Sequence, residues 1–245
     1  MSPSPSADPL ARLASLEGVA SAMAAARDGI DVLLRDRGLR QSPPELTAES
    51  LVLGAHASAV LEGSGSDLEE MRAGQGDATA QAALRVSAEL LGQTPVLSRA
   101  PLQAFARLHT LAGKSVVEDA NLGRPRDAAG AARLNDLARL LVAPTEAPAL
   151  VVAAIVHAEL ATVAPFVSHN GIVARAAERL VLVARGVDPK SLVVPEAGHL
   201  RLRREYESNL RGYAQGGSAG VHAWLLYAAE GYAAGAEASP AVPRH

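Results

Sequence analysis

One segment of the chain is apolar on nearly all sides over about four helical turns. Residues 149–163 read ALVVAAIVHAELATV, with one histidine and one glutamate as the main polar interruptions. A helix at a protein surface carries a polar stripe, and a helix that lacks one is enclosed by other elements. The segment therefore predicts a bundle with this helix at its centre. The helix is expected to end at Ala164, because α conformation is disfavoured for a residue that precedes proline.

The composition favours helices around this central one. Hydrophobic residues make up 49% of the 245 residues but aromatic residues only 3%, so the core must consist largely of alanine, leucine and valine. Small and aliphatic side chains suit packed helices. The sequence predicts an all-α fold in a single domain over residues 10–234. Residues 1–9 and 235–245 are rich in small residues and proline and are expected to be disordered tails.

Glycine, proline and serine residues separate the expected helices. These helices cover residues 13–34, 49–61, 78–91, 99–111, 131–142, 149–163, 171–185, 199–214 and 219–234. Ser98 is expected to cap the helix that follows it. Residues 112–130 are interrupted by glycine and proline and are expected to be irregular, with a short strand at 115–118.

Charge and residue counts exclude several classes of protein. A net charge of -3 is near zero for this length and argues against a surface dedicated to nucleic acid. No apolar run reaches the ~18 residues that span a bilayer, and residues 1–9 do not read as a signal peptide. We therefore expect a cytoplasmic protein without membrane contact. The absence of cysteine excludes disulfides and thiolate metal sites. Nothing in the sequence identifies a protein partner or an oligomeric state.

The histidines form no metal-binding pattern. His56, His109 and His157 are scattered, without the His-x-x-x-His or Glu-x-x-His spacing that places two ligands on one face of a helix. We therefore expect no metal site. His157 lies on the central apolar helix and is expected to be a hydrogen-bonded core residue.

The loop after the central helix has features of an anion site. Asn170 and Gly171 are expected to open the next helix, whose first N–H groups and dipole attract anions. Asn170 is suited to cap that helix, and Gly171 permits close approach to the backbone. Arg175 lies about one turn further on. The same residues fit an ordinary helix–loop–helix with an asparagine cap, and the spacing alone leaves both interpretations open.

Residues 163–175, VAPFVSHNGIVAR, resemble the active-site loop of the Fic (Fido-domain) family. The family pattern reads His-Pro-Phe-x-[Asp/Glu]-Gly-Asn-Gly-Arg-x-x-Arg. The residues that match it are Pro165, Phe166, Asn170, Gly171 and Arg175. The resemblance implies that Asn170, Gly171 and Arg175 bind a nucleotide, and that the nucleotide is ATP.

Further matches follow in the family's order over about residues 45–230. Residues 58–63, SAVLEG, resemble the family's inhibitory helix, [Ser/Thr]-x-x-x-Glu-[Gly/Asn]. Shorter matches lie at residues 108–109 (LH), 123–126 (GRPR), 157–160 (HAEL) and 186–189 (GVDP). The resemblance implies a Fido-like helical bundle with a short β-hairpin flap over the site. It also implies that Ser58 and Glu62 are regulatory residues and that Glu62 forms a salt bridge with Arg175.

The positions that carry the family's chemistry differ in this chain. The resemblance places the catalytic base at Ala164, the metal-binding acidic residue at Ser168, a glycine at His169 and the first arginine at Ile172. Without its base, the transfer of AMP from ATP to a hydroxyl loses roughly 10²–10⁴ in rate. An uncharged serine does not hold Mg²⁺ against water. We therefore expect no catalytic residue in this loop, no Mg²⁺ and no AMP transfer.

Three functions are compatible with the sequence. We favour a nucleotide- or phosphate-binding regulatory module with a Fido-like fold and no transferase activity. The first alternative is an active AMP transferase with altered chemistry, in which His169 replaces the missing base. The second is a helical interaction protein with a vestigial pocket, whose flap edge binds a peptide strand.

Overall fold

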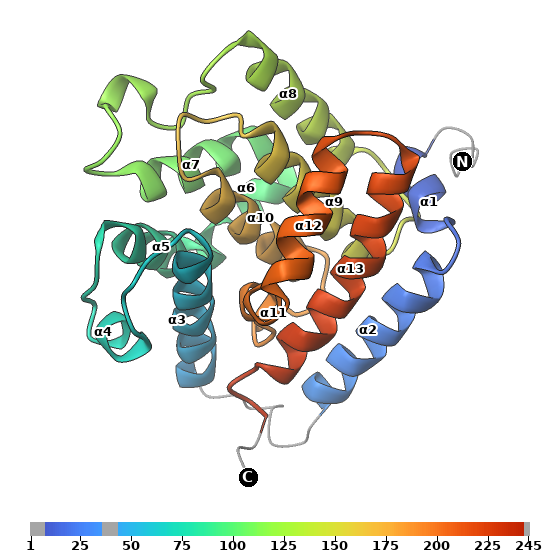
Figure 1. The fold of residues 1–245 in the computed structure, drawn as a ribbon, viewed down its shortest axis with the longest axis horizontal. Helices are drawn as coiled ribbons and strands as arrows, with labels where there is room; N and C mark the ends of the chain where they lie inside the picture. Colours follow the sequence, from blue (N-terminus) through green and yellow to red (C-terminus); the bar gives the residue numbers. More distant parts are fainter. Residues whose placement is uncertain (1–7, 36–43, 243–245) are drawn as a thin grey trace.

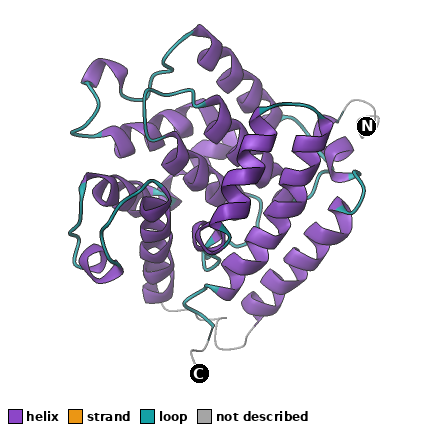
Figure 2. Ribbon diagram, in the orientation of Figure 1, coloured by secondary structure: helices purple, strands orange, loops and turns teal. Residues whose placement is uncertain are grey.

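The computed structural model describes residues 8–35 and 44–242, which form a bundle of thirteen α-helices and no strand (Figures 1 and 2). The helices are α1 (Pro9–Ala14), α2 (Val19–Arg35), α3 (Pro44–Leu61), α4 (Leu68–Arg72), α5 (Ala78–Glu89), α6 (Thr94–Arg99), α7 (Pro101–Gly113), α8 (Ala128–Val142), α9 (Ala149–Val163), α10 (Asn170–Ala184), α11 (Pro195–Arg201), α12 (Arg203–Ala214) and α13 (Ser218–Glu237). Two short 3-10 turns are η2 (Leu91–Gln93) and η3 (Asp119–Asn121). The predicted all-α fold is confirmed. Within the described ranges, no helix is both long and apolar enough to span a membrane.

Helices α9 and α10 form the centre of the bundle (Figure 1). Both are buried along most of their length, and α9 begins and ends at the predicted residues. Helix α10 packs against α3, α5, α6 and α7, whereas α9 packs against α8, α12 and α13. The loop that joins the two central helices therefore emerges at one end of the core, beside α3 and α7.

Glycine allows neighbouring helices to approach closely. A methyl group at Gly198 of α11 would overlap the carbonyl oxygen of Gly231 in α13. A methyl group at Gly54 of α3 would overlap the Arg179 guanidinium of α10. Short distances between helix backbones are the means by which a core with few aromatic side chains reaches normal packing density.

Several predicted helix boundaries differ from those observed: the helix predicted over 199–214 is divided into α11 and α12, and the one predicted over 49–61 begins at Pro44. Two further differences have local reasons. The helix predicted over 13–34 is divided into α1 and α2, because Gly18 adopts φ +74° between them. Ser98 does not cap a helix, because it lies inside α6 and its hydroxyl donates to Thr94 O. The next helix, α7, begins instead at Pro101, where the missing proline N–H needs no partner.

The strand predicted at 115–118 is wrong, and with it the short β-hairpin flap. The N–H groups of Val116 and Val117 both donate to Gly113 O, so the chain turns back at the end of α7. Ser115 adopts φ +70°, which is incompatible with an extended strand. Residues 114–127 instead form an irregular segment that contains η3, and we call them the flap segment.

The folded domain extends beyond the predicted limits at both ends. The Asp8 carboxylate accepts from the Leu10 and Ala11 N–H groups and caps α1. At the other end α13 continues to Glu237, and the Gly235 carbonyl accepts from the Val194 N–H. Asp8 therefore supplies a helix cap, and residues 235–237 are part of α13. Residues 1–7 and 243–245 of the predicted tails lie outside the described residues.

Candidate functional site

Residues 164–169 form a tight loop between α9 and α10. Ala164 ends α9 in the left-handed conformation with φ +46°, and His169 precedes α10 with φ +57°. The expectation that Asn170 caps α10 is wrong. Its side chain accepts from Phe166 N–H and donates to Phe166 O, both at 2.9 Å, and so closes the loop on itself. As a result, no side chain caps the first N–H groups of α10.

Phe166 attaches this loop to α7 and to the flap segment. Its ring is buried and stacks on His109 of α7 at a centroid distance of 4.3 Å. His109 Nδ1 accepts from the Gly123 N–H at 3.0 Å, so the ring carries its proton on Nε2, which has no partner in the described part of the chain. Burial is the main cause that lowers the pKa of His109 to about 4. The Arg126 N–H completes the attachment by donating to Pro165 O at 2.8 Å.

The predicted salt bridge between Glu62 and Arg175 is confirmed. Glu62 Oε1 lies 2.8 Å from Arg175 Nη2. Ser58 holds the same guanidinium, since its Oγ accepts from Nε at 2.9 Å and its carbonyl oxygen accepts from Nη2 at 3.1 Å. The side chain of Arg175 is 2% exposed and that of Glu62 is 33% exposed. Arg175 therefore faces inward toward α3, and solvent reaches the pair through its carboxylate.

Glu62 also covers the start of α10. A methyl group at Gly171 would overlap Glu62 Oε1, so the carboxylate lies directly against the helix backbone. This end of a helix attracts anions through its unpaired N–H groups and its dipole. The chain thus places its own carboxylate where the sequence predicted an external anion. A side chain at position 171 would displace the Glu62 carboxylate from this place.

The substituted positions do not rebuild a catalytic centre. Ala164 has no titratable group, and Ile172 is 2% exposed and lies among residues of α3 and α5. Ser168 Oγ lies 2.6 Å from His169 Nδ1. Burial lowers the pKa of His169, and the charge of Glu62 opposes this only in part. The loop therefore contributes one hydroxyl–imidazole pair and no carboxylate.

Behind Arg175 lies a buried polar cluster that sequence reasoning missed. Glu178 of α10 is fully buried, and its Oε2 is hydrogen-bonded to His157 Nδ1 at 2.8 Å and to His199 Nε2 at 2.9 Å. These three residues are metal-ligand types whose ligand atoms lie within 4.8 Å of one another. Ligand atoms around a tetrahedral zinc ion are about 3.3 Å apart. The shorter contacts here have the geometry of two hydrogen bonds to one carboxylate oxygen.

Three tyrosines complete the cluster. Their contacts are Tyr206 OH to His157 Nε2 at 2.9 Å, Tyr227 OH to His199 Nδ1 at 2.8 Å and Tyr232 OH to Glu178 Oε1 at 2.9 Å. Burial opposes the charge of Glu178, but attraction and hydrogen bonds from the two histidines hold its pKa below the ordinary value. Burial lowers the pKa of His157 to about 4. The expectation that His157 is a hydrogen-bonded core residue is confirmed.

Sequence spacing hides this cluster. Glu178 is 21 residues from each of its histidine partners, so the three side chains meet only through the packing of α9, α10 and α11. One signal was present, because Arg175, Glu178 and Arg179 interrupt the mostly apolar segment 171–184. Charged residues in such a helix require buried partners.

Arg179 also has buried partners, in α3, in α11 and in the segment before α11. Its Nη1 lies 3.2 Å from Glu196 Oε2, and the two side chains are 2% and 5% exposed. Ser191 Oγ accepts from Arg179 Nε at 2.7 Å, and the Ser50 carbonyl accepts from Nη1 at 3.2 Å. This ion pair joins α10 to α3 and α11.

Comparisons with known proteins identify the fold. No family model and no curated protein matches the sequence. The crystal structure of a Fic family protein from Desulfovibrio desulfuricans G20 is similar, with 17% identity and a TM-score of 0.75 over 91% of this chain and 74% of that one. Fic-1 from C. elegans has 18% identity and a TM-score of 0.70 over 89% of this chain and 71% of that one. The chain has a Fic fold.

The Fic fold confirms the architecture that the sequence motifs predicted. At 17–18% identity the likeness shows the fold alone. The functions of the site residues therefore rest on the geometry of this chain. The structure brings together the predicted residues Asn170, Gly171, Arg175, Ser58 and Glu62 at one end of α10.

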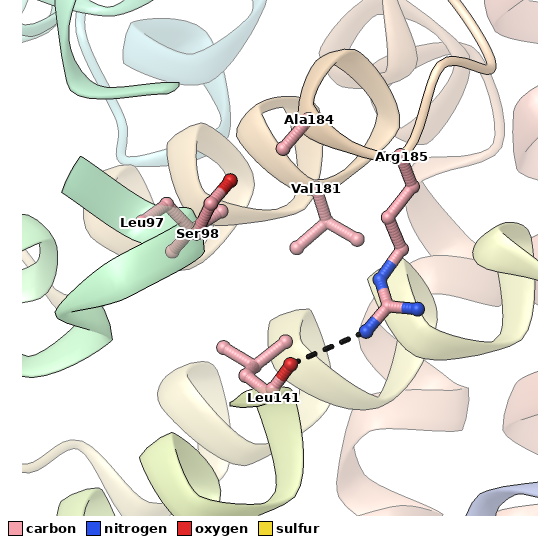
Figure 3. Close-up of a pocket in the computed structure, with 6 residues that line it drawn as sticks. All are labelled: Leu97, Ser98, Leu141, Val181, Ala184 and Arg185. Carbon is pink, nitrogen blue, oxygen red and sulfur yellow. Dashed lines mark hydrogen bonds between the residues drawn. The ribbon is translucent and has the colours of Figure 1, made fainter. Parts of the chain in front are cut away.

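A cavity of about 170 Å³ lies at the other end of α10 in this Fic fold. It is lined by Leu97, Ser98, Leu141, Val181, Ala184 and Arg185 (Figure 3). Arg185 Nη2 donates to Leu141 O at 3.3 Å. The C-terminal turns of α6, α8 and α10 meet here, and helix C-termini carry partial negative charge. Arg185 compensates part of that charge through its bond to the Leu141 carbonyl.

A second cavity, of about 280 Å³, borders the loop from outside. Apolar residues of α7 and α8 line it together with Pro125 of the flap segment and Phe166. Leu102 at this cavity is 39% exposed. The cavity contains no charged side chain, so it differs in chemistry from the start of α10.

Proposed function

We propose that this protein is a regulatory module that holds the phosphate groups of a nucleotide at the start of α10 and transfers no AMP. One observation carries the proposal: a carboxylate already lies against Gly171 and pairs with Arg175. A phosphate group is attracted by the same N–H groups and the same guanidinium. ATP is the nucleotide that the loop motif implies.

The described conformation is the closed form of this site. Arg175 donates to Ser58, Tyr206 and Glu62, and of these three partners Glu62 is the one that is partly exposed and open to exchange with a ligand. A phosphate oxygen that approaches Gly171 must displace the Glu62 carboxylate, because two anions repel at such a distance. Glu62 is partly exposed and can turn into solvent. Glu62 thereby regulates the site, and Ser58 helps to hold the Arg175 guanidinium in place.

The loop suits a nucleotide better than it suits a metal ion. Mg²⁺ binds through carboxylates and phosphates, and the loop offers only the Ser168 hydroxyl and backbone oxygens. No base faces a target hydroxyl, because Ala164 has no titratable group and His169 Nδ1 is hydrogen-bonded to Ser168. We therefore propose binding that does not depend on Mg²⁺.

Calorimetric titration with ATP tests this proposal. We expect weak binding to the natural chain, because Glu62 competes for the start of α10. The variant Glu62→Gln removes the competing charge and is expected to bind ATP at least about tenfold more tightly, a gain of about 1.4 kcal/mol. Adding Mg²⁺ should change neither affinity by more than about twofold.

The matched control is Glu69→Gln. Glu69 is an exposed residue of α4 that pairs with Arg72, so its loss removes the same charge away from Gly171. Its ATP affinity should equal that of the natural chain. If Glu62→Gln binds neither ATP nor pyrophosphate, the start of α10 is not an anion site and the proposal fails.

A second candidate function is AMP transfer with His169 as a displaced base. The observation that favours it is the 2.6 Å contact between Ser168 Oγ and His169 Nδ1, which places an imidazole beside a hydroxyl at the start of α10. Incubation with labelled ATP and a lysate tests it. Labelling by Glu62→Gln that disappears when His169→Ala is added would favour this candidate over the first. We expect no labelling in either variant.

The third possibility was that a peptide strand extends the edge of the flap. We do not propose this function, because residues 114–127 contain no strand with which a peptide could form backbone hydrogen bonds. The cavity beside Phe166 is the remaining apolar feature near the flap segment.

A further inference from the structure

A continuous chain of hydrogen bonds leads from the surface of the site into the core. Glu62 Oε1 accepts from Arg175 Nη2 at 2.8 Å, and Tyr206 OH accepts from Arg175 Nη1 at 3.0 Å. Tyr206 OH lies 2.9 Å from His157 Nε2, and His157 Nδ1 lies 2.8 Å from Glu178 Oε2. Four of the five residues are buried, and Glu62 alone is partly exposed.

The arginine at one end and the ionised carboxylate at the other fix the directions of the hydrogen bonds in this chain. A guanidinium has no acceptor, so Arg175 donates to the Tyr206 oxygen. The ionised Glu178 carboxylate can only accept, so the neutral His157 ring has its proton on Nδ1, and its bare Nε2 accepts from the Tyr206 hydroxyl. The lowered pKa of His157, caused mainly by burial, agrees with this neutral ring.

Glu178 anchors the inner end of the chain. Its Oε2 accepts from both His157 and His199, and its Oε1 accepts from Tyr232 OH at 2.9 Å. A carboxylate that accepts three hydrogen bonds is held in one rotamer, and it holds its donors in turn. The His157 ring therefore cannot turn without breaking bonds at both of its nitrogens.

The cluster has a second arm that does not reach Arg175. His199 Nδ1 is bound to Tyr227 OH at 2.8 Å, and Tyr227 makes no hydrogen bond to Arg175. Tyr206 and Tyr227 are each 4% exposed, and each completes the bonds of one histidine beside Glu178. The two tyrosines thus have the same burial and the same chemistry, and they differ in their contact with Arg175.

We infer that Tyr206, His157 and Glu178 are positioning residues for Arg175, and that they set the orientation in which it holds either Glu62 or a bound phosphate. The inference rests on the proposed function for its ligand. Its structural basis is the chain of hydrogen bonds, which exists whichever anion is bound. Without the Tyr206 hydroxyl, Arg175 Nη1 loses its acceptor in a buried place and the guanidinium turns to find another.

The test compares Tyr206→Phe with Tyr227→Phe, each in the natural chain and in Glu62→Gln. In the Glu62→Gln background, Tyr206→Phe should weaken ATP binding about tenfold, because the phosphate loses an oriented guanidinium. Tyr227→Phe should change it by less than about twofold. Both variants remove one buried hydroxyl of the same cluster, so a merely structural effect would be equal in the two.

A spectroscopic readout separates this inference from the proposed function. In protein labelled with ¹⁵N-arginine, the Arg175 Nε–H signal, assigned with Arg175→Lys, should exchange slowly with solvent. Tyr206→Phe should accelerate this exchange at least about tenfold, and Tyr227→Phe should leave it unchanged. If Glu62→Gln binds no ATP, the proposed function fails, and the exchange rates still decide the inference.

Glu178→Gln provides a second variant of nearly unchanged size. A neutral amide cannot accept from two histidines and a tyrosine as the carboxylate does, so the His157 proton should move from Nδ1 toward Nε2. The histidine ¹⁵N spectrum reports that change, and Arg175 Nε–H exchange should rise with it. Equal effects of Tyr206→Phe and Tyr227→Phe, or unchanged Arg175 exchange in Glu178→Gln, would overturn the inference.

Discussion

Arg175 and Arg179 lie one turn apart on α10, and both are buried beside a carboxylate, but their partners differ in access to solvent. Glu196, the partner of Arg179, is 5% exposed, whereas Glu62, the partner of Arg175, is 33% exposed. Arg179 holds three helices together through Ser50, Ser191 and Glu196. Arg175 holds a carboxylate that can leave.

The difference separates a structural ion pair from an exchangeable one. A fully buried pair is costly to break because the remaining charge has no other partner. A pair with one exposed member loses less, because water solvates the released charge. On the same helix, Arg179 thus stabilises the fold, whereas Arg175 holds a carboxylate that a ligand can replace.

The largest expected effect comes from removing each arginine. Arg179→Met leaves Glu196 buried without its cation, and we expect a loss of about 3–5 kcal/mol in the free energy of unfolding. Arg175→Met leaves Glu62 free to turn into water, and we expect a loss of about 1–3 kcal/mol. Urea unfolding followed by circular dichroism measures both. Equal losses in the two variants would contradict the comparison.

Low pH should destabilise the folded protein through the buried cluster behind Arg175, which contains His157. Unfolded His157 binds a proton near its ordinary pKa of 6.5, but the folded protein binds it only near pH 4. Unfolding therefore takes up a proton between these values, and the folded state loses roughly 3 kcal/mol as the pH falls through this window. Buried His109 has a similarly lowered pKa and adds to the loss.

Urea unfolding at a series of pH values between 7 and 4 measures the slope of the free energy of unfolding against pH. In His157→Gln, the number of protons taken up on unfolding, which sets this slope, should be lower by about one. Ser191→Ala, which weakens only the Arg179 region, should lower stability at every pH and leave the slope unchanged. A slope that Ser191→Ala alters and His157→Gln does not would place the titrating group elsewhere.

Alanine substitutions at Gly54 and Gly171 also test the difference between the two ion pairs. Gly54→Ala pushes a methyl into the Arg179 guanidinium and to 2.9 Å from Glu196 Oε2, and neither group can withdraw. We expect it to lower the free energy of unfolding by about 1–3 kcal/mol. Gly171→Ala pushes a methyl into Glu62, which can turn outward, so we expect a change of less than about 1 kcal/mol. Thermal unfolding of the two variants tests this difference, and a larger loss in Gly171→Ala would refute it.

The smallest effect is expected from Glu62→Gln. Because the pair is open to solvent on the Glu62 side, its loss should change the free energy of unfolding by less than about 1 kcal/mol. Glu196→Gln serves as the matched substitution in the closed pair and should cost more. Comparable losses would mean that Glu62 is as fixed as Glu196 and cannot act as a displaceable residue.

Local patterns in the sequence were sufficient for the central architecture. The apolar stretch 149–163 and the following proline predict α9 and its end, because both are properties of adjacent residues. The motif at 58–63 and Arg175 predict the salt bridge, because the resemblance indicates which two residues pair. Their spacing in the sequence does not. The prediction of a β-hairpin flap was wrong because only two of the residues 115–118 are β-branched and the segment follows directly on the last turn of α7.

The buried cluster could not be predicted in the same way. Its members come from α9, α10, α11, α12 and α13, and no local pattern states which helix faces meet. Asn170 shows a similar limit at short range. Its position before the helix suggests a cap, and only the left-handed turn at His169 directs its side chain back to Phe166.

The paired bond between Asn170 and Phe166 also bears on how the protein ages. In asparagine followed by glycine, the next backbone nitrogen most readily attacks the side-chain amide carbon, which releases ammonia and forms a cyclic imide. Water then opens this ring to aspartate or isoaspartate. Here both ends of the amide are engaged and Gly171 is fixed in the first turn of α10, so the attacking nitrogen and its target carbon are held apart. Ammonia loss then requires the loop to open. Isoaspartate at this peptide bond should therefore form no faster than the loop opens, and its rate of formation in stored protein would measure that opening.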